Sequence, residues 1–311
     1  MIVCVAASPS IDKLFEVERV EIGAIHRPDA FVQVPGGKGL NVARAAASLG
    51  AEVRATGILA GHAGRWLEEA LSAEGITGAF AWAEGETRAS LSVADRTDRG
   101  LTEFYERGMD IGPDGWRRLE EVTAWLLPGA TWVTMSGNLP LGAPPEGYAR
   151  LIAIAHEAGI PVALDARDQA LAQGVAARPE LVKVNAEEAS GLLGRAVGSL
   201  EEARAAALEI RGRLDERGTA IVTRGAEGAV IASPDGVLLG RLFARGPYPV
   251  GSGDAFLGGL VTCLDRAETD RVAALRLALG AAAANAEVPG AGRLDPSRAV
   301  GLVERAEVFE L

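Results

Sequence analysis

The sequence is poor in the residues that build disulfide frameworks, metal centres and histidine-based catalytic sites. It contains only 2 cysteines, Cys4 and Cys263, which lie far apart in separate apolar runs. This pattern predicts buried thiols in a reducing compartment. With 3 histidines in all, no Cys/His cluster has metal-ligand spacing, and His156-Glu157 lacks the second histidine of a zinc-protease helix. A metal centre built from these residues is therefore not expected.

Basic residues are also in deficit, since 31 Lys+Arg against 42 Asp+Glu give a net charge of −11. Such a charge argues against nucleic acid or an anionic membrane as the main partner. The longest apolar tract, around residues 273–284, is mostly alanine and includes Arg276, and the apolar residues 1–7 lack a preceding basic segment. We therefore expect no membrane span and no signal peptide, and a cytoplasmic location. An anionic substrate would need a local basic cluster.

Three widespread ligand-binding motifs are missing. Gly37-Lys38 is followed by Gly39 where a P-loop has serine or threonine, and position 32 is not glycine. No G-x-G-x-x-G follows the first apolar run, and no serine lies in a G-x-S-x-G elbow. The sequence therefore excludes a P-loop nucleotidase, gives no support to a dinucleotide-binding fold, and lacks the hydrolase nucleophile.

The sequence does contain a regular alternation of strand and helix patterns. Its 311 residues include 39 glycines and are 48% apolar. Short apolar runs at residues 2–7 and 53–59 predict strands buried on both faces. From residue 113 onward we expect helices at 114–127, 145–158, 169–176, 187–193 and 199–217, and strands at 131–136, 161–165, 181–183 and 220–223. This order predicts a single α/β domain over residues 1–311, with a largely parallel sheet and helices on both faces.

Two stretches interrupt this order, at approximately residues 12–34 and 78–108. In both, polar and apolar residues partly alternate, as in strands with one exposed face. In the second stretch we expect strands at 79–83, 88–94 and 101–105. We interpret the two stretches as one small β-sheet that forms a lid.

Residues 251–254 read G-S-G-D and precede a small, apolar, helix-compatible run. The unpaired N–H groups of a helix start would bind an anion, and a carboxylate beside them makes sense as a base that removes a proton from a hydroxyl. The alternative is a glycine-rich loop in which Asp254 is an ordinary first-turn acid. The segment alone leaves both open.

Five motifs in order resemble the ribokinase-like (pfkB-type) family of carbohydrate kinases, from residue 1 to about residue 300. They are G-G-K-G-L-N-V-A at 36–43, S-G-N-L-P at 136–140, K-V-N-A-E-E at 183–188, T-R-G-A-E-G at 223–228, and G-S-G-D at 251–254. Ser252, Asn138 and Val184 depart from the family's usual alanine, serine and proline. Of these, Asn138 affects substrate contacts in our interpretation, and Val184 affects only loop stiffness.

The resemblance implies an ATP-dependent kinase with Mg²⁺, in which Asp254 is the catalytic base and the amides around Gly251, Ser252 and Gly253 form the anion hole. It places Asp12, Gly37, Lys38, Asn41 and Ser136 on the sugar. It places Lys183, Asn185, Thr223, Gly225, Glu227, Gly228 and Asn285 on the nucleotide, and Asn185 with Glu188 on Mg²⁺ through water. Each has a plainer interpretation: Asn185 and Glu188 also fit a helix capping box, and Asp12 a polar turn. Asp165 stays open between a structural and a phosphate-proximal role.

Other residues favour a sugar phosphate as acceptor. Arg88 lies on a lid-side strand where ribose kinases usually lack an arginine. The segment around Arg27 (G-A-I-H-R-P, 23–28) and S-P-S-I-D at 8–12 resemble the 1-phosphofructokinase and tagatose-6-phosphate kinase branch. Guanidinium groups match phosphate oxygens. The preferred acceptor is therefore a ketohexose phosphate.

Alternatives remain open at this point. They are a kinase of a neutral sugar or nucleoside, and a catalytically silent sugar-phosphate sensor. The family also suggests a homodimer formed through the lid and leaves a monovalent-cation (K⁺) requirement open.

Overall fold

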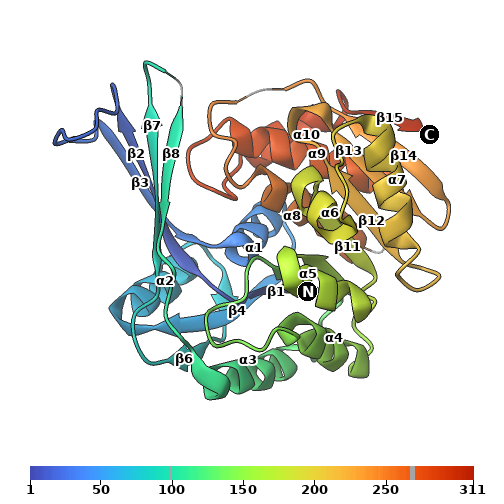
Figure 1. Cartoon of the computed structure of the whole chain (residues 1–311), viewed down its shortest axis with the longest axis horizontal. Helices are drawn as coiled ribbons and strands as arrows, with labels where there is room; N and C mark the ends of the chain where they lie inside the picture. Colours follow the sequence, from blue (N-terminus) through green and yellow to red (C-terminus); the bar gives the residue numbers. More distant parts are fainter. Residues whose placement is uncertain (99, 245, 267–269) are drawn as a thin grey trace.

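The computed structural model describes residues 1–98, 100–244, 246–266 and 270–311. Within them, the largest element is an 11-stranded sheet (Figure 1). In spatial order its strands are β15 (Glu307–Glu310), β14 (Gly236–Arg241), β13 (Ala229–Ser233), β12 (Thr219–Thr223), β11 (Leu181–Asn185), β10 (Val162–Asp165), β9 (Trp132–Ser136), β1 (Ile2–Ala6), β4 (Val53–Ala60) and β5 (Thr77–Gly78), with β6 (Ala81–Ala83) also paired to β4. Neighbours from β12 to β4 run parallel, and β13 to β15 add antiparallel strands at one edge. The predicted largely parallel sheet is confirmed.

Strand β1 shows how the sheet separates two cores. Its residues are at most 1% exposed, and because successive side chains point to opposite faces, Val3 packs into one core while Ile2 and Cys4 pack into the other. Helices α3 (Gly112–Leu126), α4 (Gly147–Glu157), α5 (Asp168–Ala176), α6 (Ala186–Leu193) and α7 (Leu200–Arg211) contribute to the first core. Helices α1 (Lys38–Ser48), α2 (Gly61–Ala73), α8 (Ser252–Asp265), α9 (Arg271–Ala286) and α10 (Pro296–Val303) contribute to the second. The helices therefore cover both faces, as expected, and both cysteines are buried.

A second, four-stranded sheet projects from this body as a blade (Figure 1). Its order is β3 (Ala30–Gly36), β2 (Ser10–Val17), β7 (Ala89–Asp95) and β8 (Leu101–Tyr105), with β2 and β7 parallel and the other pairs antiparallel. It therefore draws on both of the stretches that interrupt the main alternation. We call it the small sheet.

One predicted strand belongs elsewhere. The segment at 79–83 was expected in the small sheet, but β6 pairs in parallel with Ile58–Ala60 of β4 in the large sheet. Phe80 and Ala81 are buried in the two cores beside that strand. The apolar contacts with β4 therefore determine the pairing, which the alternation of residues alone did not reveal.

Two helix starts follow the sequence closely. At α6, Glu188 N donates to Asn185 Oδ1 and Asn185 N donates to Glu188 Oε2, both at 2.8 Å. Ser199 and Glu202 form the same capping box at α7. Both patterns satisfy backbone N–H groups that the helix itself leaves unpaired. Across the described ranges, no helix combines the length and apolar character that crossing a membrane requires.

Candidate active site

The sequence motifs converge at the carboxyl ends of the parallel strands. Asp165 at the end of β10 is in register with Ser136 at the end of β9, and Asn185 at the end of β11 is in register with Thr223 of β12. Since parallel strands end at the same edge, these residues form one row. Helices α1 and α8 pack on each other beside it. This edge is the candidate active site.

Helix α8 begins with an abrupt turn at Gly251, whose φ is +82°. A Cβ built there would lie 2.6 Å from the backbone nitrogen of Gly292, so both the conformation and the space require glycine. Ser252 N donates to Pro249 O at 3.2 Å, but the N–H groups of Gly253 and Asp254 donate no hydrogen bond within the described chain. Gly253 and Asp254 lie within the 251–254 segment that the sequence predicts as an anion hole, whereas the amide of Ser252 is already paired, and the anion-hole role stays a prediction.

Asp254 lies in the first turn of α8 and is 6% exposed. Its Oδ2 accepts a hydrogen bond of 2.8 Å from Asn41 Nδ2 on α1. Burial raises the pKa of this carboxyl from 3.8 to about 6, against the opposing attraction of nearby lysines. A carboxylate whose pKa lies near neutrality is suited to accept a proton and release it again. The geometry therefore fits a general base next to an anion site.

A network of two lysines and two carboxylates lies beside Asp254. Asp165, fully buried, accepts from Lys38 Nζ at 3.0 Å and from Lys183 Nζ at 2.5 Å, and Lys38 also contacts Glu188 Oε1 at 3.0 Å. Burial alone would lower the pKa of Lys38, but the three carboxylates around it outweigh burial and raise it. Likewise burial raises the pKa of Asp165, but the two lysines lower it below its usual value. Lys38 and Asp165 are therefore both charged at neutral pH.

The network brings positive charge to the anion hole. A Cβ built on Gly253 would lie 3.4 Å from Lys183 Nζ, so the ammonium group is adjacent to the start of α8. Lys38 is less enclosed, with 35% of its side chain exposed. Both ammonium groups are paired with carboxylates, Lys38 with Asp165 and Glu188 and Lys183 with Asp165, so the network places positive charge near the helix start without being basic as a whole.

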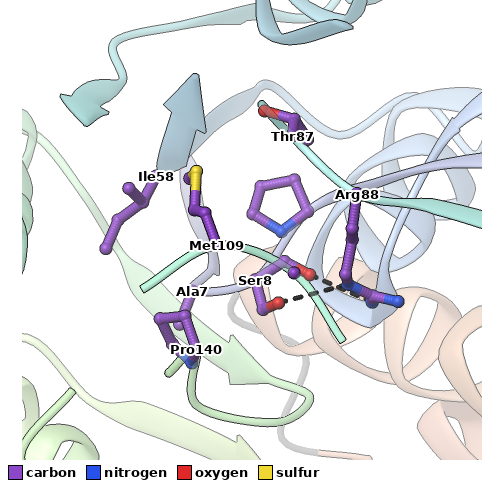
Figure 2. Close-up of a pocket in the computed structure, with 9 residues that line it drawn as sticks. Ala7, Ser8, Ile58, Thr87, Arg88, Met109 and Pro140 are labelled. Atoms are coloured by element: carbon purple, nitrogen blue, oxygen red, sulfur yellow. Dashed lines mark hydrogen bonds between the residues drawn. The ribbon is translucent and has the colours of Figure 1, made fainter. Parts of the chain in front are cut away.

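Arg88 lines a pocket between the small sheet and the strand ends (Figure 2). Its Nε donates to Ser8 Oγ and its Nη2 to Ser8 O, both at 3.3 Å, and its Nη1 donates to Ser90 Oγ at 3.0 Å. Arg88 forms no ion pair within the described residues. Burial lowers its pKa, and the negative charge of Asp12 is the largest influence that opposes this. The remaining pocket-lining residues are Ala7, Ser8, Pro9, Ile58, Thr87, Gly108, Met109 and Pro140. Because its hydrogen-bond partners are all neutral, this guanidinium is not already neutralised by a direct ion pair in the described structure.

Asp12 and Gly37 lie next to each other at the start of the small sheet and the start of α1. Asp12 Oδ1 accepts from Ser10 Oγ at 2.6 Å, and Oδ2 accepts from Gly37 N at 3.4 Å. Burial raises the pKa of Asp12. Gly37 has φ +93° and precedes α1, which places Lys38 and Asn41 toward the strand ends. The fold thus brings together Asp12 of the 8–12 segment and Gly37 of the 36–43 motif, both of which the sequence predicts to bind the sugar.

The predicted nucleotide loop lies between β12 and β13. A short 3₁₀ helix, η1 (Gly225–Glu227), begins at Gly225, whose φ is +56°, and is followed by Gly228, whose φ is +103°. Thr223 Oγ1 donates to Val184 O at 3.3 Å, and Glu227 pairs with Arg224 at 2.5 Å. The loop is therefore positioned beside the Lys183–Asn185 strand end. Contact with ATP stays a prediction for these residues.

Three other candidates differ in their surroundings. Ser136 Oγ is buried and has no hydrogen-bond partner in the described structure. Asn285 is fully buried and its Nδ2 donates to Gly290 O at 3.3 Å and Arg293 O at 2.9 Å, so its visible contacts hold a loop. Arg27 is exposed in the connection between β2 and β3, at the opposite end of that hairpin from Gly36. The fold does not bring Arg27 to the strand ends within one chain.

Sequence reasoning undervalued Asp165 and did not single out Arg44. Asp165 binds both lysines of the network, and its position after a buried strand was the available signal. Arg44 is 5% exposed and donates to Asn41 Oδ1 at 3.4 Å. The sequence feature that could have identified Arg44 is its charge on the buried face of an alanine-rich helix.

Comparison with known proteins agrees with the geometry. The chain is 33% identical to a 1-phosphofructokinase of Rhodobacter capsulatus over 284 residues, which cover 88% of this chain and 87% of that protein. It is 32% identical to a 1-phosphofructokinase of Xanthomonas campestris, with 94% and 93% covered. A crystal structure of phosphofructokinase-2 from Escherichia coli in complex with potassium superposes with a TM-score of 0.89 at 27% identity, covering 97% of this chain and 98% of that one. Residues 2–298 match the pfkB family of carbohydrate kinases, and the chain belongs to that family.

Proposed function

We propose that this protein transfers the γ-phosphoryl group of ATP to a hydroxyl of a ketohexose phosphate. The observation that carries the proposal is the buried Asp254, with a pKa of about 6, at the helix start where two amides are unpaired. Asp254 accepts the proton of the attacking hydroxyl, while the amides of Gly253 and Asp254 stabilise charge on the transferring phosphoryl group. Lys183 beside them adds positive charge.

ATP and Mg²⁺ are the donor and metal that the family implies, and the residues present fit a water-mediated Mg²⁺ site. In the described ranges, no group of three His, Cys, Asp or Glu side chains could hold a metal ion directly. Both carboxylate oxygens of Glu188 already accept hydrogen bonds, from Lys38 and from Asn185 N, but each retains a free lone pair. Mg²⁺ commonly keeps several waters and binds to substrate phosphates. Asn185 and Glu188 would hold its waters, and the ion would neutralise phosphate charge.

The acceptor's phosphate group would bind at Arg88. Its three hydrogen bonds go to neutral atoms of Ser8 and Ser90, so a phosphate would be its first ionic partner. Asp12 and Asn41 would bind sugar hydroxyls on the side that leads to Asp254. The names of the curated relatives support a sugar phosphate over a neutral sugar.

The most direct test is ATP consumption with fructose 1-phosphate, fructose 6-phosphate, tagatose 6-phosphate, fructose and ribose. We expect turnover with at least one of the phosphorylated sugars and a much lower kcat/KM with fructose and ribose. Asp254→Asn should lower kcat by about 10²–10⁴, because general-base catalysis contributes about that much. Asp295→Asn, at the start of α10, is the matched control and should leave kcat unchanged.

Two outcomes contradict the proposal. Higher kcat/KM with ribose or fructose would assign the protein to kinases of neutral sugars. Binding of a sugar phosphate without ATP consumption would identify a sensor.

The proposal extends to the small sheet and to K⁺. We propose that the small sheet is a lid that also pairs with a second copy, because Phe31, Phe104 and Tyr105 are 57%, 60% and 60% exposed on it. A K⁺ requirement is supported by Asn285 Oδ1, a buried oxygen without a partner in the described structure, next to the loop that packs on Gly251. Replacing K⁺ by tetramethylammonium should then lower kcat.

A further inference from the structure

Asn41 is hydrogen-bonded on both sides of its amide. Its Nδ2 donates to Asp254 Oδ2 at 2.8 Å, and its Oδ1 accepts from Arg44 Nη1 at 3.4 Å. Asn41 and Arg44 lie three positions apart in α1 and therefore on the same face of the helix. A guanidinium only donates hydrogen bonds, so it requires the amide oxygen to face it. Rotation of the amide by 180° would bring Asn41 Oδ1 against the Asp254 carboxylate and its N–H₂ against Arg44.

Arg44 is itself held in one place. It is 5% exposed, and its guanidinium donates to Pro35 O at 2.5 Å, to Ala291 O at 2.9 Å and to Glu74 Oε2 at 2.8 Å. The first carbonyl belongs to the end of β3 and the second to the loop after α9. Burial lowers the pKa of Arg44, and the carboxylate of Glu74 opposes this. Lysine could not make this set of bonds, because its donors come from one atom.

The loop that Arg44 binds is also part of the anion-hole turn. A Cβ on Gly251 would lie 2.7 Å from Ala291 Cα, and a Cβ on Gly292 would lie 2.5 Å from Asn41 O. The loop is therefore wedged between the start of α8 and α1. Arg44 donates both to Ala291 O, in the loop that packs against Gly251, and to Asn41 Oδ1, the amide that binds Asp254. It therefore connects this loop to the residue that holds the Asp254 carboxylate.

We propose that Arg44 is a positioning residue for the phosphoryl-transfer reaction, which fixes the amide of Asn41 so that it donates to the carboxylate of Asp254. Arg44 does not reach the substrate, because it is buried behind Asn41. The inference rests on the proposed kinase function and adds a residue that the sequence motifs did not identify.

The pH profile distinguishes this role from a purely structural one. The hydrogen bond from Asn41 lowers the pKa of Asp254, and the charged groups that also act on it are Lys38, Asp165 and Lys183. When Arg44 is absent, the amide of Asn41 is free to rotate, and the donated bond weakens. The acidic limb of kcat against pH should therefore move upward by about 0.5 pH unit or more, whereas a loss of packing alone would not move it.

The experiment compares Arg44→Ala, Asn41→Ala and the double variant, using ATP consumption with the best sugar phosphate. We expect Arg44→Ala to lower kcat about 10- to 100-fold, with the KM for ATP changed less than about threefold. In the Asn41→Ala background the same substitution should have little further effect on kcat, because the two act as one unit. Ethylguanidinium at millimolar concentration should restore part of the activity of Arg44→Ala.

Arg266→Ala is the matched control. Arg266 Nη2 donates to Leu49 O at 2.9 Å and so connects α8 to the end of α1, far from Asp254. It should lower the Tm without moving the pH limb. If Arg44→Ala fails to fold, Arg44→Lys keeps the charge and is measured in its place.

The outcomes separate this inference from the proposed function. No sugar-phosphate-dependent ATP consumption by the wild-type enzyme would overturn the proposed function itself. An active wild type whose folded Arg44 variant keeps the same pH limb and kcat, or shows full additivity with Asn41→Ala, would overturn the positioning role alone.

Discussion

At the scale of single residues, the site depends on one carboxylate that is buried at a cost. Asp254 has a raised pKa because burial disfavours its ionised form more than the nearby lysines favour it. Asp165, only slightly more buried, has a lowered pKa because two ammonium groups contact it directly. Two aspartates of similar burial thus differ in how readily they accept a proton, and only Asp254 is suited to do so.

The cost of burying Asp254 predicts a pH-dependent gain in stability for Asp254→Asn. Between pH 3.8 and about 6 the folded protein holds a proton on Asp254 that the unfolded chain has lost. Wild-type stability from this group therefore falls as the pH rises through that interval and stays lower at neutral pH. The variant should be more stable than the wild type at pH 7.5 by about 1–3 kcal/mol. Urea unfolding at pH 4.5, 6 and 7.5 measures this difference. A difference that shrinks as the pH rises would contradict it.

Arg88 predicts a selective loss of substrate affinity. Arg88→Ala should raise the KM for the sugar phosphate about tenfold or more, because a charge-assisted hydrogen bond contributes about 1.5–3 kcal/mol. Arg88→Lys should recover part of this loss, since it keeps the charge without the bidentate geometry. The KM for ATP serves as the internal control and should not change. Steady-state kinetics with an unchanged sugar-phosphate KM would place the phosphate elsewhere.

At the scale of elements, the sequence predicted local structure well and long-range contacts poorly. The capping boxes at Asn185 and Ser199 involve residues three positions apart, so their residue types were enough. The bond between Asn41 and Asp254 joins residues 213 positions apart, and only the family resemblance placed them in one site. The position of β6 beside β4 depends on which core receives Phe80 and Ala81, which no local pattern specifies. Arg44 was missed for the same reason, because its partners come from four segments.

The turn before α8 gives a prediction at this scale. Gly251→Ala should destabilise the protein by about 1–2 kcal/mol from the left-handed conformation alone, and displacement of the 290–292 loop should lower kcat. Gly301→Ala is the control, because Gly301 lies inside α10 with open space around it. This variant should be more stable than the wild type by up to about 1 kcal/mol, because alanine favours a helix more than glycine does. Chemical denaturation and kcat measured on both variants test the pair. Wild-type activity in Gly251→Ala would contradict a role for this turn in the anion hole.

At the scale of the whole molecule, the small sheet exposes large apolar side chains that nothing within one chain covers in the described structure. All five residues of β8 are exposed, including Phe104 and Tyr105. Large exposed apolar groups gathered on one element indicate an interaction surface. Arg27, remote from the strand ends within one chain, belongs to the same projecting element.

This predicts that the small sheet determines the oligomeric state. If the proposed dimer forms through this sheet, Phe104→Lys should give a monomer in sedimentation velocity and leave the far-UV circular dichroism unchanged. Trp125→Lys, which replaces another exposed aromatic on α3, should leave the assembly intact. A wild-type monomer, or a Phe104→Lys dimer, would contradict pairing through this sheet.

The burial of both cysteines has a practical consequence for following the small sheet in solution. Burial raises the pKa of the Cys4 thiol to about 12, and Cys263 is 2% exposed, so neither should react with maleimide in the folded protein. A single cysteine introduced at an exposed position of the small sheet would then be the only site labelled, without removal of the native thiols. A fluorophore or spin label there would report whether the small sheet moves when nucleotide and sugar phosphate are added.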